Sequence, residues 1–171
     1  MATLKTKMSY AEAKDLTERL ITRLAPACAR LEIAGSVRRK KPEVGDLELV
    51  VIPQTENIVD MFGSLFKLDA AIPGQLIKGG NNYRKYDLGP ITLDLFLTTP
   101  EKWGCIFTIR TGSAEFSHRL VTARKFGGLC PSNLKFKDGR IWDGDTTLET
   151  PEEADVFKAL HMYWIEPEKR I

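Results

Sequence analysis

The sequence lacks long apolar runs and has few cysteines, and both features limit the classes of protein to consider. No stretch of 18 or more apolar residues occurs, so neither a membrane-spanning helix nor a membrane partner is predicted. The N-terminal segment MATLKTKMSYAEAK has no apolar core, so a secretory signal is not predicted either. Cys28, Cys105 and Cys130 are too far apart for a zinc site or a disulfide framework. We therefore expect an intracellular protein of a reducing compartment, the cytoplasm or nucleoid, whose thiols are packing residues.

The charged residues are distributed unevenly in the second half of the chain. From Lys102 to Arg140 there are eight Lys or Arg and two acids, whereas from Ile141 to Glu168 there are one Lys and eight acids. One basic surface facing a polyanion would explain this asymmetry, and a solvated surface of mixed charge would explain it equally well. His118 and His161 lie far apart, and we expect both to be surface or packing residues.

Capping residues and hydrophobic spacing predict alternating helices and strands in the first half of the chain. Ser9 and Glu12 have the spacing of a capping box, and the apolar residues behind them predict a helix that stops near Pro26. The runs RLEIAGS, DLELVVIP and ITLDLFL predict strands. Between the last two runs, Thr55 is a candidate cap for a second helix, and residues 74–90 predict a hairpin or a pair of short strands with Gly and Asn turns.

After Pro100 the pattern changes, and a second lobe is expected. Ser113 is a candidate cap for a helix that ends at the Gly-Gly pair 127–128. The Asp-Gly pair 138–139 predicts a hairpin within LKFKDGRIWDGD. The Thr-Pro pair 150–151, followed by two glutamates, predicts the start of a final helix.

Three acids occupy positions where a plain core strand has no use for a carboxylate. Asp46 and Glu48 are two residues apart on a predicted strand, so their side chains leave the same face. Asp94 lies between leucines on another predicted strand. If these strands are neighbours, the three carboxylates converge, and such hard oxygen ligands suit Mg²⁺ with substrate phosphates. A pair of such ions can hold both an attacking hydroxyl and a leaving phosphate oxygen.

A Gly-Ser turn and a run of cations precede the acids. Gly35 allows backbone N–H groups to approach a phosphate closely, and Ser36 adds a hydroxyl donor. Arg39 supplies a guanidinium, whose rigid fork matches phosphate oxygens. A Gly-Ser turn and an acid pair on a strand are each common. Their order here, with a third acid following, indicates a site that holds metal ions and phosphates.

The segments GSVRRKKPEVGDLELVV and ITLDLFL together resemble the palm of the DNA polymerase beta superfamily of nucleotidyltransferases. The double Arg after Gly-Ser, the segment FTIRTGSAEF and the closing WIEPEKR resemble family X DNA polymerases more closely. This resemblance implies an α+β fold. A nucleotidyltransferase palm, with a mixed, mostly antiparallel sheet flanked by helices, would cover residues 1–99. A small thumb-like lobe that contacts nucleotide and DNA would cover residues 100–171.

The resemblance also implies roles for individual residues. Asp46 and Glu48 would bind two Mg²⁺ ions, with Mn²⁺ as an alternative, and Asp94 would bind the ion that activates a primer 3′-hydroxyl. The residues implied in binding a nucleoside triphosphate are Gly35, Ser36, Arg39, Gly45, Thr111, Gly112 and Ser117. The residues expected to contact DNA, as a primer–template or gapped duplex, are Arg119, Arg124, Lys125, Lys135 and Lys137.

Several residues depart from the family pattern. Glu48 stands where Asp is usual, which keeps the charge and relaxes the metal geometry. Ile109 and Arg110 replace an aromatic pair that helps to judge the sugar. Ser117 and Val121 stand where a base-contacting Asn and a template-contacting Arg are often found, so these departures bear on sugar choice and fidelity. The sequence also starts almost at the palm, which predicts a minimal monomeric enzyme or one that borrows an accessory DNA-binding protein.

Three hypotheses about function follow from the sequence. The leading one is a DNA-directed DNA polymerase of family X type that fills short gaps in DNA repair. The second keeps the fold but changes the acceptor: a template-independent nucleotidyltransferase acting on RNA, a small molecule or a protein. The third is a DNA- or nucleotide-binding module without catalysis. All three depend on whether the acids at 46, 48 and 94 meet beside the turn at 35–36.

Overall fold

The computed structural model describes residues 7–54 and 67–171, and the chain divides into two compact units, Met1–Thr98 and Thr99–Ile171. Each unit contains a sheet and a cluster of buried apolar side chains of its own. The helix predicted after Thr55 lies outside the described residues. None of the described helices combines the length and the apolar character that a membrane crossing requires.

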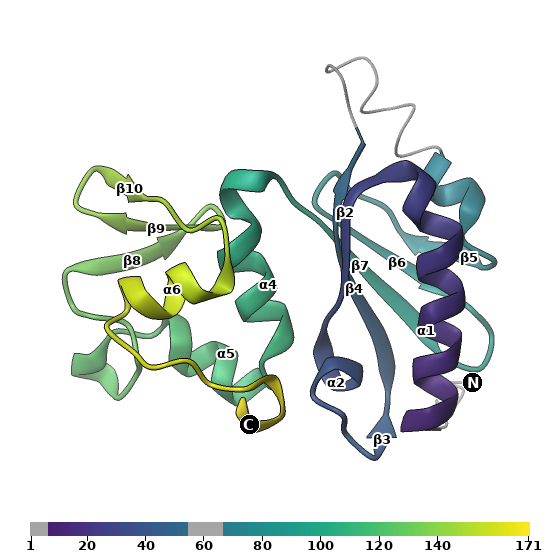
Figure 1. The fold of residues 1–171 in the computed structure, drawn as a ribbon, viewed down its shortest axis with the longest axis horizontal. Coiled ribbons are helices and arrows are strands. Elements are labelled where there is room, and N and C mark those ends of the chain that lie inside the picture. Colours follow the sequence, from purple (N-terminus) through teal and green to yellow (C-terminus); the bar gives the residue numbers. More distant parts are fainter. Residues whose placement is uncertain (1–6, 55–66) are drawn as a thin grey trace. The chain divides into compact units, whose positions relative to one another are not determined.

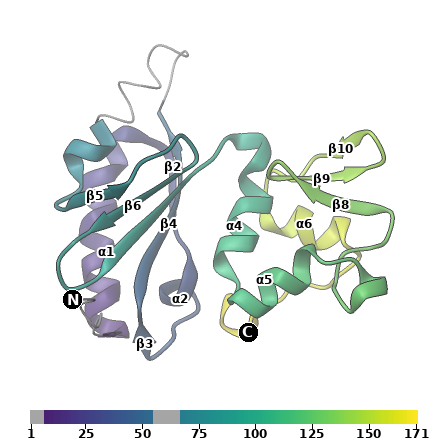
Figure 2. The same ribbon diagram turned by 180° about the vertical axis from the view of Figure 1, so that it is seen from behind.

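The first unit is built on a five-stranded sheet with the strand order β2-β4-β7-β6-β5 (Figures 1 and 2). Its strands are β2 (Cys28–Ile33), β4 (Asp46–Pro53), β5 (Gln75–Lys78), β6 (Tyr83–Asp87) and β7 (Thr92–Leu97). The central pair β4–β7 is parallel, and the other three pairs in this sheet are antiparallel. The predicted mixed, mostly antiparallel sheet is therefore confirmed, as is the predicted pair of short strands within residues 74–90.

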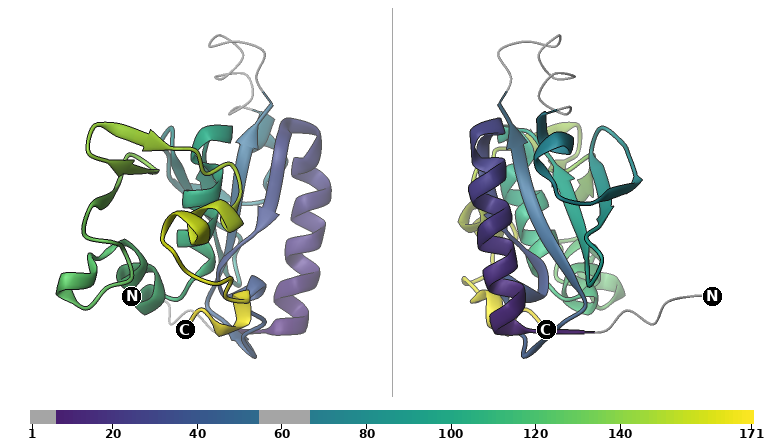
Figure 3. Two further views of the ribbon diagram at one scale, coloured as in Figure 1. Left: turned by 60° about the vertical axis from the view of Figure 1, so that its left-hand side comes forward. Right: turned by 90° about the vertical axis from the view of Figure 1, so that its right-hand side faces the viewer.

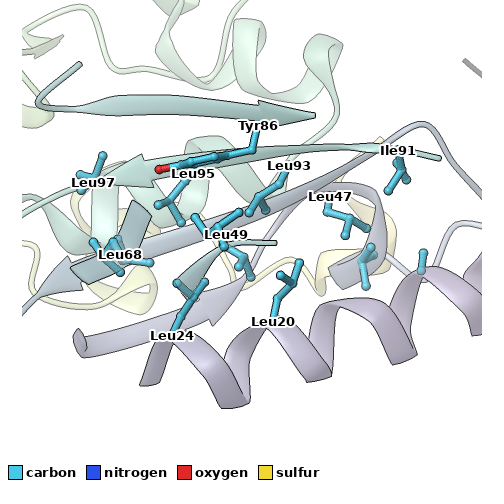
Figure 4. Close-up of a cluster of buried hydrophobic side chains, with 14 of the residues drawn as sticks. Leu20, Leu24, Leu47, Leu49, Leu68, Tyr86, Ile91, Leu93, Leu95 and Leu97 are labelled. Carbon is cyan, nitrogen blue, oxygen red and sulfur yellow. The ribbon is translucent and has the colours of Figure 1, made fainter. Parts of the chain in front are cut away.

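Helix α1 (Tyr10–Leu24) covers one face of this sheet (Figure 3). The predicted capping box is confirmed, because Ser9 Oγ accepts the Glu12 N–H at 3.4 Å and Glu12 Oε2 accepts the Ser9 N–H at 3.1 Å. Pro26 falls in a single 3-10 turn that follows the helix. The apolar stripe of α1 faces the sheet, where Leu20 and Leu24 pack against the leucines of β4 and β7 (Figure 4).

A short connection between β2 and β4 completes the first unit. The predicted Gly-Ser turn is one turn of helix, α2 (Gly35–Arg38), followed by β3 (Glu43–Val44). Strand β3 pairs with β1 (Met8–Ser9), which brings the start of the chain beside the segment that leads into β4. This pairing holds the end of the connection that leads from α2 to the acid-bearing strand β4.

The second unit consists of three helices and a three-stranded antiparallel sheet (Figure 1). The helices are α4 (Trp103–Thr111), α5 (Ala114–Val121) and α6 (Glu153–Ala159). The strands are β8 (Leu134–Lys137), β9 (Arg140–Asp143) and β10 (Thr146–Leu148), with β9 in the centre. The predicted hairpin is confirmed, since Asp138 and Gly139 have φ of 54° and 76° between β8 and β9, as a tight primed turn requires.

Two helix boundaries differ from the prediction. Helix α5 is capped by the Ser113 hydroxyl as expected, at 3.0 Å from the Phe116 nitrogen, but it ends at Val121. The chain leaves the helix there because the Thr122 carbonyl accepts the Cys130 N–H at 3.0 Å. Helix α6 begins at Glu153, and its cap is Glu152 rather than Thr150, whose carbonyl accepts the Gly104 N–H at 3.1 Å.

Candidate active site

The three acids singled out in the sequence lie on one face of the five-stranded sheet. Glu48 of β4 and Asp94 of β7 are direct partners in the parallel register. Asp46 lies two residues before Glu48 on β4, so it shares the same face. The alternate residues of both strands, Leu47, Leu49, Leu93 and Leu95, are fully buried in the core under α1. Because successive side chains on a strand point to opposite faces, the acids leave the face that α1 does not cover.

Asp94 is the most buried of these acids, and it is held by two donors from the next strand. Its residue is 8% exposed. Its Oδ1 accepts bonds from Lys85 Nζ at 2.7 Å and from the Tyr83 hydroxyl at 3.0 Å. Lys85 is the direct cross-strand partner of Asp94 in the β6–β7 pair. A cation from the protein itself therefore balances the charge of the deepest carboxylate.

The charge of Lys85 is coupled to more than one acid. Partial burial lowers the pKa of this ammonium, but the hydrogen bond and the charge of Asp94 outweigh that effect, and Asp46 contributes in the same direction. The net result is a raised pKa, so Lys85 stays protonated throughout the neutral range. Asp46 and Asp94 thus act on one cation from two neighbouring strands.

Glu48 lies against the start of α2, and this contact explains why residue 35 is glycine. A Cβ on Gly35 would come within 1.8 Å of Glu48 Oε2 and 2.6 Å of Glu48 Cδ. Gly35 also has φ of +59°, a conformation that side chains other than glycine adopt at a cost. The glycine therefore allows the Glu48 carboxylate to approach the backbone of α2.

Ser36 lies in α2 and Arg39 directly follows it, so this short helix places both residues near the acids of β4. The Ser36 hydroxyl oxygen is buried and has no hydrogen-bond partner among the described residues. Such an orphaned polar group is uncommon in folded proteins and is costly unless a ligand satisfies it. Burial lowers the pKa of the Arg39 guanidinium, while the charges of Glu48 and Asp46 act against that effect. Both acids of β4 therefore interact electrostatically with Arg39.

Among the predicted nucleotide-binding residues of the first unit, Gly45 has no role that the structure explains. It is exposed and directly precedes β4. No atom lies within 4 Å of a Cβ built at this position, and its φ is not positive. Nothing in the structure explains why position 45 should be glycine.

In the conformation described, the three carboxylates do not form a metal-ligand cluster. No three His, Cys, Asp or Glu side chains within residues 7–54 and 67–171 lie close enough together to hold an ion. In this conformation Asp94 is bonded to Lys85, and the Glu48 carboxylate lies against Gly35. The donor set itself, three hard carboxylates on adjacent strands of one sheet face, fits Mg²⁺ in its chemistry.

The other predicted nucleotide-binding residues belong to the second unit. Thr111 is buried at the end of α4, and Gly112 follows it. A Cβ on Gly112 would come within 2.4 Å of the Phe116 ring, so this glycine allows the close turn from α4 into α5. The Ser117 hydroxyl donates to the Ile109 carbonyl at 2.5 Å and so ties the two helices together. That bond gives Ser117 a structural role that the sequence did not predict.

The predicted DNA-contacting residues also lie in the second unit, and all five are exposed cations. Four of them have the potential to meet phosphates. These are Arg119 on α5, Lys125 in the following loop, and Lys135 and Lys137 on β8. Arg124 is different, because its guanidinium donates to the carbonyls of Leu129 at 3.2 Å and Leu160 at 2.7 Å. Arg124 therefore stabilises the loop between α5 and β8 through these hydrogen bonds.

Lys85 and Tyr83 are the members of the candidate site that the sequence did not single out. Their strand lies in a Gly- and Asn-rich stretch with mixed charges, where a lysine is more often solvated. The signal was their spacing: both alternate onto one face of β6, and β6 pairs with the strand that carries Asp94. Only the order of strands in the sheet shows that this face meets the acid.

Comparison with known proteins gives one finding, and it concerns the second unit. Residues 108–171 match the family described as DNA polymerase beta thumb. No curated protein matches the chain. The matched segment starts within α4 and includes α5, the three-stranded sheet, α6 and the C-terminal residues.

Proposed function

Because this chain is a family X, polymerase beta-like protein with a polymerase beta thumb domain, we propose that it is a DNA-directed DNA polymerase. It would add a nucleotide to a primer 3′-hydroxyl with release of pyrophosphate, on short gaps in duplex DNA. The observation that carries this proposal is the placement of Asp46, Glu48 and Asp94 on one sheet face beside α2. A carboxylate group next to a phosphate-binding turn is the arrangement that nucleotidyl transfer requires.

The phosphate side of the reaction is assigned to α2 and the residue after it. The buried Ser36 hydroxyl would donate to a phosphate oxygen and so gain the partner that it lacks among the described residues. Arg39 would turn its guanidinium from the acids toward the triphosphate, where a planar fork binds two oxygens at once. Gly35 would keep the backbone of the turn close to these oxygens.

The carboxylate side is assigned to β4 and β7. Asp46 and Glu48 would hold both divalent ions, and Asp94 would hold the one nearer the primer terminus. Mg²⁺, when bound, supplies neutralisation of the triphosphate and a lower pKa for the attacking hydroxyl. The rigid sheet fixes where these carboxylates stand, so the side chains orient the reacting oxygens without moving the backbone. Lys85 would release Asp94 as the ion binds and remain beside it as a counter-charge.

The direct test is the variant D94N, which keeps the shape of the side chain and removes its charge. We expect nucleotide incorporation on a gapped DNA substrate to fall by at least about 100-fold, because one ligand of the ion at the primer terminus is lost. Binding of the nucleoside triphosphate should change little, since it depends on α2. The matched control is D15N, which removes an exposed acid on α1. Extension by D94N at close to the parent rate would refute the proposal.

The same assay separates the proposed polymerase from the two other hypotheses. Labelled gapped, recessed and single-stranded DNA primers, RNA ends and small-molecule acceptors are incubated with each nucleotide in turn. Preference for gapped DNA with templated incorporation supports the proposal, whereas transfer to another acceptor without a template supports the second hypothesis. Absence of any transfer, together with nucleotide binding that Mg²⁺ or Mn²⁺ does not tighten, supports a binding module.

A further inference from the structure

One face of the sheet in the second unit groups cations around an indole ring. In the β8–β9 hairpin, Lys135 is the register partner of Trp142, and Lys137 is the partner of Arg140. Register partners share a face of the sheet, so all four side chains leave on the same side. The alternate residues leave on the opposite side, where Leu134 and Ile141 are buried in the core of this unit. We refer to the side with Lys135, Lys137, Arg140 and Trp142 as the outer face.

The Trp142 side chain is partly exposed, and one hydrogen bond orients its indole. Its Nε1 donates to the Lys137 carbonyl at 3.1 Å, which uses the one polar group of the ring. Lys137 Nζ lies 5.6 Å from the ring centroid, near the outer limit of a cation–π contact. A ligand that offered both a flat ring and a negative charge would replace this contact with two better ones, a stacked ring and an ion pair.

The two sides of this sheet differ in charge. On the strands themselves the outer face carries Lys135, Lys137 and Arg140, and its remaining strand residues are Trp142 and Thr147. The acids lie on the other side: Asp143 lines a cavity of about 480 Å³ together with Glu149 and Asp155. Two further acids lie near the outer face: Asp138 in the turn, and Glu101, whose charge interacts with that of Arg140. The strands thus present one positive surface, and a polyanion is its complement.

We infer that the outer face binds single-stranded DNA, with one unpaired base stacked on Trp142 and the adjoining phosphates against Lys135, Lys137 and Arg140. This inference rests on the proposed function, since it takes DNA as the substrate. An unpaired base is required, because the π face of a base in a duplex is already stacked on its neighbours. An aromatic ring flanked by cations on a sheet is a suitable platform for such a strand, independent of base sequence.

The first experiment measures binding of a fluorescein-labelled oligothymidine to the full chain by fluorescence anisotropy. W142L should weaken binding by about 10-fold, because base–aromatic stacking is lost. W142F should lie between W142L and the parent, since a smaller ring still stacks. The control is Y163L, which removes an aromatic side chain that is 95% exposed elsewhere in this unit and should leave binding unchanged. Circular dichroism of each variant shows that it remains folded.

The second experiment measures the salt dependence of the same binding. K135Q and K137Q should each reduce the slope of log K against log salt by about 0.7, the value for one phosphate contact on a single strand. K158Q, on α6, removes an exposed lysine outside this face and should leave the slope unchanged. If W142L binds as Y163L does, or if the slopes of all three lysine variants agree, the outer face is only a solvated sheet surface and the inference fails.

Failure of the inference is distinguishable from failure of the proposed function. Primer extension by the unaltered protein on gapped DNA tests the polymerase activity and does not depend on the anisotropy result. A protein that binds the oligonucleotide through Trp142 but extends no primer would retain the inference and refute the activity. If the protein extends primers but its W142L variant binds the oligonucleotide as tightly as the parent does, the activity is supported and the inference fails.

Discussion

At the scale of single residues, the candidate site depends on two contacts that a substitution can test. One is the approach of the Glu48 carboxylate to Gly35, and the other is the bond between Lys85 and Asp94. Both keep carboxylates in place on the sheet face that α1 leaves open. Neither contact is visible from residue spacing, because each joins residues on different elements.

Gly35 is expected to be irreplaceable for a steric reason beyond its backbone angle. In G35A the new methyl would meet Glu48 Oε2, and the residue would also hold φ of +59°. The matched control is G144A, since Gly144 has φ of +57° and open space around its Cβ position. G144A should lose about 1–2 kcal/mol of unfolding free energy in urea from the left-handed conformation alone. G35A should lose more and should also lose primer extension; equal losses in the two variants would show that the Glu48 contact is unimportant.

Lys85 is expected to compete with divalent ions for Asp94. In K85M the half-saturating Mg²⁺ concentration for primer extension should fall several-fold, because no cation then needs to be displaced from Asp94 Oδ1. The same variant should unfold more easily in a chelating buffer, since it leaves a buried carboxylate unbalanced. K158M, which removes an exposed lysine on α6 in the second unit, is the control for both measurements. A higher Mg²⁺ requirement in K85M would instead indicate that Lys85 supports the ion site.

At the scale of elements, the C-terminal segment is anchored in the second unit by one arginine. Arg170 is fully buried, its Nη1 donates to Glu153 Oε1 at 2.6 Å, and its Nε donates to the Ile165 carbonyl at 2.9 Å. Its guanidinium also lies 5.0 Å from the Phe157 ring and 4.7 Å from the Trp164 ring. The Arg170 carbonyl accepts the Ser113 N–H at 2.9 Å, which joins the C-terminus to the start of α5.

Loss of this anchor is expected to destabilise the second unit strongly. R170M should lower its free energy of unfolding by about 3–5 kcal/mol, because Glu153 is left as a buried carboxylate without its partner. The double variant R170M/E153Q should recover part of the loss, since the uncompensated charge is gone. K169M, at the exposed neighbouring lysine, should have little effect in the same tryptophan-fluorescence melts. A double variant no more stable than R170M would argue that ring packing, not charge, dominates.

Elements with local signals were predicted well from the sequence, and elements fixed by distant contacts were not. The α1 capping box and the Asp138-Gly139 turn each depend on residues that lie close together in the sequence, and both are confirmed. The end of α5 and the start of α6 were predicted wrongly, because bonds from Cys130 and Gly104 decide them. For the site, alternation placed Asp46 and Glu48 on one face, but the role of Lys85 needed the strand order.

At the scale of the whole molecule, the two buried clusters lie in different units and can be probed separately. All three tryptophans lie in the second unit, so tryptophan fluorescence reports on its packing alone. Circular dichroism reports on both units. The apolar cores share no residue, as the first contains Leu20 and the second contains Ile141.

Unfolding is therefore expected to depend on which core is damaged. L20A should lower the stability of the first unit by about 2–5 kcal/mol and move the circular dichroism transition without moving the tryptophan transition. I141A should move the tryptophan transition by a comparable amount. Chemical denaturation followed with both signals on the same samples makes this measurement. Coincident shifts of both signals in both variants would show that the chain unfolds as one cooperative body.

The lysine at position 85 has a consequence for how this protein can be handled and stored. A cluster of acids usually leaves a protein dependent on its ion for stability, so that chelation starts its decay. Here the most buried acid, Asp94, is already paired with the Lys85 ammonium group, whose Nζ lies 2.7 Å from Asp94 Oδ1. A chelator cannot remove this cation. Preparations kept in excess EDTA should consequently retain their melting temperature and regain full activity on addition of magnesium.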